Sequence, residues 1–219
     1  ARALELCDAH QAPAATSERI ARSLRHLRPD DQTLFERIAR TLRAEARWDE
    51  LVALLEEASA AMHSPDDRMP LQQELARTLD LALGRTDDAQ KVLRALASAR
   101  TPDHNAHLHL AAIALRRTQF DAYLAAREQH ARAIDPLWAA IVHCHLAEAC
   151  DEQDRAAQVA SNYRRARTLD ADNTFANEAL RALGRRLRNW RQFAALLSDE
   201  NERELTWSAR SARLCTLGK

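Results

Sequence analysis

Apolar residues recur along the chain every three to four positions, the spacing that puts side chains on one face of a helix. One recurring segment centres on an apolar residue followed by a small one, with further residues of the same face three positions before and four after. Its central residues lie at 38, 75, 110, 146 and 180, which are 37, 35, 36 and 34 positions apart. This regular spacing predicts an internal structural repeat.

A second helical segment follows each copy of this pattern. After the first copy, Leu51, Leu55 and Ala58 share one face, and Trp48, Phe120 and Trp190 are expected to open second helices as packing residues. Proline or Asp-rich breaks separate the pairs, because proline cannot continue a helix. Helix pairs are expected at residues 31–46 with 48–62, 67–83 with 86–99, 103–117 with 119–133, 137–150 with 153–169 and 174–188 with 190–200, after an earlier pair at 1–10 and 16–28.

The composition also favours helices. The chain has 45 Ala and 31 Leu, but Val and Ile together number only 9, and there are 3 Gly and 6 Pro. Sheets need β-branched residues for strands and Gly or Pro for turns. The hydrophobic fraction of 46% is enough for a core. No run of apolar residues is long enough to predict a membrane-spanning helix.

This layout resembles the tetratricopeptide repeat (TPR) family, most closely over residues 35–58 and 143–166. Alanine stands where the family pattern has glycine in four units, at Ala39, Ala76, Ala111 and Ala147. A closely related helical-hairpin repeat is the alternative. The resemblance implies an all-α fold, an α-solenoid of antiparallel helix pairs wound into a right-handed superhelix.

We expect one repeat domain over residues 1–219. Its expected units are 1–29, 30–65, 66–101, 102–135, 136–171, 172–202 and a partial unit at 203–219. The chain opens on Ala1 within a helical pattern, so we interpret it as a fragment of a longer protein.

Charge gives little indication of a nucleic-acid or membrane partner. Lys plus Arg and Asp plus Glu each total 32, so the net charge is zero. Arg accounts for 30 of the 32 cations. That excess could serve carboxylate or phosphate recognition, but codon bias in a GC-rich, bacterial genome is the simpler interpretation. The four cysteines form no CxxC pair and are interpreted as small core residues in a reducing, cytoplasmic compartment.

The resemblance implies that first helices line a concave groove that holds a peptide or partner protein. Residues between the packing positions of these helices are the candidate partner-binding residues. They are Arg40, Arg43, Arg77, Asp80, His109, Arg116, His145, Glu148, Asp151 and Arg185. Their mixed charge suits a partner of mixed charge, and a merely solvated helix face is the alternative.

Histidines are concentrated between His104 and His145, and they form a ladder at equivalent repeat positions. His107 and His143 occupy slots where the family usually packs an aromatic ring, so we interpret them as half-buried packing residues. A zinc site needs three or four ligands on one side, which this spacing does not provide. No metal and no cofactor are expected.

No enzymatic motif is present. The three glycines form no phosphate-binding loop, and neither HExxH nor GxSxG occurs. Cys144 lies between two histidines, but adjacent residues on a helix point about 100° apart, so neither can easily serve as its base. The basic run at 185–191, which contains Trp190, is interpreted as helix packing rather than a nucleic-acid site.

The sequence therefore predicts a non-catalytic scaffold that binds a peptide or partner protein. The alternative is a regulatory sensor, in which a ligand closes the superhelix and signals to an attached effector domain. Self-association through the solenoid ends is a weaker alternative.

Overall fold

A computed structural model describes residues 14–27, 31–99 and 103–186, and helices make up nearly all of them. The helices are α2 (Ala14–Leu27), α3 (Gln32–Ala44), α4 (Trp48–Ala61), α5 (Pro65–Arg77), the π-helix η1 (Thr78–Ala82), α6 (Thr86–Ala97), α7 (His104–Arg116), α8 (Phe120–Arg132), α9 (Pro136–Glu152), α10 (Ala156–Leu169) and α11 (Thr174–Arg186). No strand occurs within these ranges. The fold is all-α, as expected.

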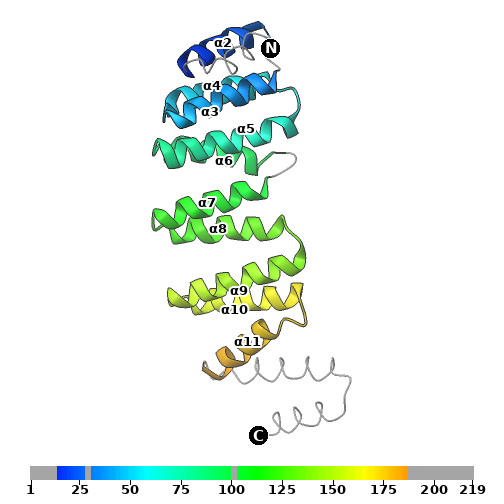
Figure 1. Cartoon of the computed structure of the whole chain (residues 1–219). Coiled ribbons are helices and arrows are strands. Elements are labelled where there is room, and N and C mark those ends of the chain that lie inside the picture. Colours follow the sequence, from blue (N-terminus) through cyan, green and yellow to red (C-terminus); the bar gives the residue numbers. More distant parts are fainter. Residues whose placement is uncertain (1–13, 28–30, 100–102, 187–219) are drawn as a thin grey trace. The chain divides into compact units, whose positions relative to one another are not determined.

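The chain divides into two compact units, residues 1–113 and 114–219, and the boundary falls inside α7. Within each unit, consecutive helices run back and forth beside one another as antiparallel pairs (Figure 1). This is the TPR-like helical-repeat arrangement. We call α3, α5, α7, α9 and α11 the first helices and α4, α6, α8 and α10 the second helices. The expected helices at 1–10 and 190–200 lie outside the described residues, and α2 corresponds to the helix expected at 16–28.

Short polar side chains begin several first helices. The Asp31 carboxylate accepts hydrogen bonds from the backbone N–H groups of Thr33 and Leu34. Ser64 accepts from the N–H of Asp66, and Asp135 accepts from the N–H of Leu137. Proline follows both of these caps, at the helix position where its missing N–H costs nothing. The breaks seen in the sequence are thus helix starts.

The turns within the helix pairs share one geometry. Ala46, Gly84, Thr118 and Asp154 have positive φ, and each lies two residues before a second helix. In three turns the next residue donates its N–H to a carbonyl five positions earlier, with N···O distances of 2.9 Å. In the fourth, Arg85 donates to Leu79 six positions earlier, at 2.7 Å.

The π-helix η1 explains this longer turn. Ten positions separate Ile38 from the start of α4, whereas eleven separate Leu75 from the start of α6. A π-helix widens the turn by one residue, so it absorbs this insertion. The sequence predicted an uninterrupted helix over 67–83 because hydrophobic spacing does not distinguish a π-turn from an α-turn.

The predicted repeat positions form the cores. In the first unit Phe35, Ile38, Leu42, Leu51 and Leu55 are buried in one cluster. In the second unit the core gathers Leu146, Ala147 and Cys150 of α9 with residues of α8, α10 and α11. The alanines that replace the family glycine, at 39, 76, 111 and 147, are all buried. A small side chain there permits close helix packing.

Arginines that immediately precede second helices connect successive pairs. Arg85 lies 3.8 Å from Asp49 at the start of α4. Arg155 pairs with Asp121 at the equivalent place in α8 and stacks over the Phe120 ring, 4.8 Å from its centroid. Arg47 contacts Glu18, Glu45 and Glu50.

None of the helices within the described ranges combines the length and apolarity that crossing a bilayer requires.

Candidate functional site

Most of the predicted partner-binding residues lie on the exposed side of a first helix. Asp80 is buried and His109 is half-buried. The exposed members are Arg40, Arg43, Arg77, Arg116, His145, Glu148, Asp151 and Arg185. The structure thus places the predicted set on the faces that packing leaves open, with Asp80 as the exception. Whether these faces bind a partner stays a prediction.

An open cavity of about 440 Å³ lies on the exposed side of α5 in the first unit. Arg43, at the end of α3, and Arg77, on α5, both line it. Trp48 and Leu81 supply apolar wall, and Leu81 is 63% exposed. Arg43 Nε donates to Glu74 Oε1 at 2.9 Å, so one of the two guanidinium groups is already engaged. No hydrogen bond or ion pair joins Arg77 to another residue in the described ranges.

Asp80 and His109 contact each other within the first unit. His109 Nε2 lies 2.8 Å from Asp80 Oδ2, and the Asp80 side chain is only 1% exposed. Nearby, Gln73 Nε2 donates to Asp103 Oδ2 at 2.6 Å. These bonds connect η1 with α7, and α5 with Asp103, the residue before α7. Asp80 therefore has a structural role in addition to the binding role predicted for it, because a buried carboxylate requires such partners.

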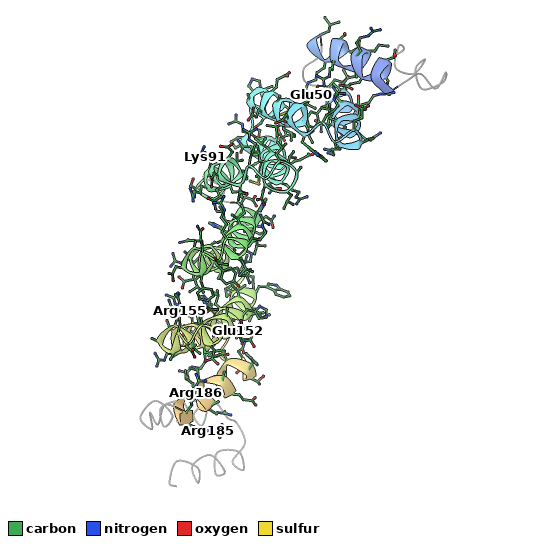
Figure 2. All side chains as sticks on the ribbon, turned by 90° about the vertical axis from the view of Figure 1, so that its left-hand side faces the viewer. Glu50, Lys91, Glu152, Arg155, Arg185 and Arg186 are labelled. Atoms are coloured by element: carbon green, nitrogen blue, oxygen red, sulfur yellow. The ribbon has the colours of Figure 1, made fainter. Side chains whose placement is uncertain are left out.

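In the second unit, the candidate residues separate into paired and unpaired groups. Arg186, labelled in Figure 2, lies at the end of α11. It donates to Asp151 Oδ1 at 2.8 Å. That contact holds the pKa of the Asp151 carboxyl below its usual range. His145 and Glu148 lie one helical turn apart on the exposed face of α9, and no hydrogen bond joins either side chain to another described residue. Arg185 is exposed in the last turn of α11.

Sequence reasoning missed a set of large apolar side chains on the same faces. Trp138 is 66% exposed, Leu137 61% and Ile141 41%, all in the first turns of α9. Phe175 in the first turn of α11 is also exposed, and its ring lies 6.1 Å from that of buried Tyr163. The helical spacing of Trp138, Ile141 and His145 was the available signal. This spacing did not predict exposed apolar residues, because apolar positions of a helix are ordinarily expected to be buried in the core.

His107 and His143 pack against their neighbours, as predicted, although His143 is buried rather than half-buried. His143 is buried, and its Nδ1–H donates to Asn162 Oδ1 at 2.9 Å, which links the two helices of one pair. His107 is half-buried, and burial lowers its pKa. Within residues 14–27, 31–99 and 103–186, no three His, Cys, Asp or Glu side chains gather as metal ligands could.

Cys144 lies on the buried side of α9, in agreement with its interpretation as a small core residue. Burial raises the pKa of its thiol to about 11, with smaller contributions from the charges of Glu148 and Asp170. An activated cysteine needs a lowered pKa. Cys144 therefore lacks the property of a nucleophile. Trp190, Cys7 and Cys215 lie outside the described residues.

Comparison with known proteins gives likenesses in structure only. No protein-family model matches the chain, and no curated protein matches it either. Among solved structures, it is similar to the C-terminal part of a TPR repeat-containing protein from Cytophaga hutchinsonii, with 12% identity and a TM-score of 0.49. That match covers 99% of this chain and 93% of the other.

Two further solved structures are similar at comparable levels. MamA shares 13% identity over 80% of this chain and 96% of its own, with a TM-score of 0.44. The TPR domain of P58(IPK) shares 15% identity over 99% of this chain and 63% of its own, with a TM-score of 0.36.

Proposed function

We propose that this chain is a non-catalytic protein-binding module whose exposed first-helix faces hold an extended segment of a partner protein. The observation that carries the proposal is the cavity beside α5 in the first unit, at 440 Å³. It combines a guanidinium, that of Arg77, with apolar wall from Trp48 and Leu81. Pockets that bind ligands are mostly apolar with a few placed polar groups.

The chemistry of this cavity favours an acidic residue of the partner next to an aliphatic one. Arg77 can form a bidentate pair with a carboxylate. Arg43 adds positive charge, although Glu74 shares it. Leu81 can bury apolar surface against a neighbouring partner side chain, since burial is worth about 25 cal/mol per Å².

A peptide-binding measurement on the complete 219-residue chain tests the proposal. The probes are labelled ten-residue peptides with a Leu-Glu or Leu-Asp pair in a Ser/Gly background, and the same peptides with Leu-Lys. We expect the acidic set to bind more tightly and Arg77→Glu to weaken that binding by roughly ten-fold or more. Arg94→Glu is the matched control, because Arg94 is an exposed arginine on the second helix α6. Equal binding by both peptide sets, or equal loss in both variants, would contradict the proposal.

The sensor alternative predicts a different readout. If a bound peptide closes the helical array, the radius of gyration from solution scattering should fall on binding. A scaffold that holds its partner without closing keeps the same value. The measurement uses the acidic peptide above at saturation, with Arg77→Glu as the non-binding reference.

A further inference from the structure

The exposed face of α9 carries an ordered stripe of five side chains. Trp138, Ile141, His145, Glu148 and Glu152 lie three or four positions apart, which places them in one row along the helix. All five are exposed. The opposite face of α9 is buried in the core of the second unit. We call this row the α9 stripe.

The N-terminal half of the α9 stripe is apolar. Trp138 and Ile141 are joined there by Leu137, so three large exposed apolar residues fall within the first six positions of one helix. Phe175 stands five positions before the core residue Leu180, as Ile141 stands five before Leu146. The two therefore hold equivalent places in successive first helices of the second unit. Several large exposed apolar side chains on one helix face are typical of an interaction surface.

The C-terminal half of the α9 stripe is acidic, and its carboxylates form no ion pair with a described residue. Three other carboxylates of the second unit pair with arginines: Asp121 with Arg155, Glu128 with Arg165 and Asp151 with Arg186. No such pair joins Glu148 or Glu152 to any residue that the structure describes. Both also lie toward the C-terminal, negative end of the helix dipole.

Charge also distinguishes which partner this surface suits. The pKa of the buried Tyr163 hydroxyl is raised, first by burial and next by the negative charge of Glu148. The Glu148 charge therefore acts on a buried neighbour as well as on the exposed face. A cation of a partner would compensate this negative field, and an anion would be repelled by it.

We propose that the α9 stripe docks a segment of a partner protein that carries a large apolar side chain and, a few positions away in either chain direction, Lys or Arg. The proposal rests on the protein-binding role given above. Ten residues separate Trp138 from Glu148, which is about 15 Å along a helix. An extended segment covers that distance in about four or five residues. The segment therefore places its cation four or five positions from its apolar anchor.

Fluorescence anisotropy with the complete chain tests this pairing. The probes are labelled ten-residue peptides with Phe and, four and five positions away, two Arg in a Ser/Gly background, in both chain directions. Reference peptides replace Phe with Ser or both Arg with Glu. We expect the Phe/Arg peptides to bind roughly ten-fold or more tightly than either reference, and more weakly at high salt.

Variants locate the binding. Trp138→Ala should weaken the Phe/Arg peptides by roughly ten-fold, and Glu148→Gln with Glu152→Gln by a smaller factor that vanishes at high salt. The controls are Leu169→Ala, an exposed leucine on α10, and Glu56→Gln on α4. Circular dichroism verifies that every variant is folded.

The outcomes separate this inference from the proposed function. Phe/Arg peptides that bind no better than the references, or binding that Trp138→Ala leaves unchanged, would overturn the inference. If acidic peptides still bind through Arg77 in that case, the proposed function stands. Self-association of the chain that Trp138→Ala abolishes would assign the stripe to a second copy and would equally overturn the inference.

Discussion

The buried hydrogen bond between His143 and Asn162 should contribute measurably to the stability of the second unit. Both side chains are buried, and the Nδ1–Oδ1 distance is 2.9 Å. Asn162 is held in place by its own Nδ2–H bond to the Gln158 carbonyl at 3.0 Å. Asn162→Ala removes the acceptor of the His143 N–H and leaves that donor buried.

An unsatisfied buried polar group costs about 1–3 kcal/mol, so we expect Asn162→Ala to lower the free energy of unfolding by that amount. The assay is urea denaturation followed by circular dichroism, with hydrogen exchange at the amides of α9 and α10 to localise the effect. Ser161→Ala is the control, because Ser161 neighbours Asn162 but is exposed on α10.

The double variant His143→Phe with Asn162→Leu tests the reasoning more sharply. It removes both polar groups and puts an aromatic ring where the TPR family usually packs one. Replacing both partners by apolar groups can be nearly neutral, so the double variant should be more stable than the sum of the two single variants predicts. Strictly additive losses, or a loss for Asn162→Ala no larger than for Ser161→Ala, would refute the reasoning.

Four further predictions follow from individual sites. Ala111→Leu should destabilise by about 1–3 kcal/mol through overpacking, because Ala111 is buried, and an unchanged thermal melt would refute the repeat register. Thr118→Gly should stabilise by about 0.5–1 kcal/mol in urea denaturation, because Thr118 has φ of 55°, a left-handed conformation that penalises a β-branched residue; a loss of stability would contradict this. Cys144, whose pKa is raised to about 11, should be alkylated by iodoacetamide slowly at pH 8 and faster as the pH rises toward 11. Site-resolved mass spectrometry measures the rate in the folded and the urea-unfolded chain, and equal rates in both states would contradict the raised pKa. His107 should titrate by NMR below its usual 6.5, because burial lowers its pKa, so its contribution to stability is present above pH 6.5 and is lost as the pH falls through the folded pKa; a midpoint above 6.5 would reverse that sign.

The helices were predictable because their signals are local. Spacing of residues such as Ile38, Leu42 and Leu51 reports which side of a helix is buried, and caps such as Asp31 and Asp135 mark where it begins. Small differences in repeat length were visible too. The π-helix η1 could not be predicted from the extra residue, because an insertion can be accommodated by a longer loop or by a wider helical turn.

The exposed faces were predictable only in part. Arg40, Arg77, His145 and Glu148 were placed correctly on open sides of their helices, because helical periodicity alone assigns a face. Asp80 was assigned to an open face as well, and the inserted residue in η1 helps to explain why it is buried instead.

The sequence by itself determined the helices, their pairing and the repeat, since these depend on near neighbours along the chain. Only the tertiary structure decided which charges are used within the fold. The contacts of Asp80 with His109, and of Asp151 with Arg186, join residues 29 and 35 positions apart. It also decided that Trp138 and Ile141 stay exposed, because burial depends on which surfaces neighbouring helices cover, and one chain's hydrophobic pattern does not report that.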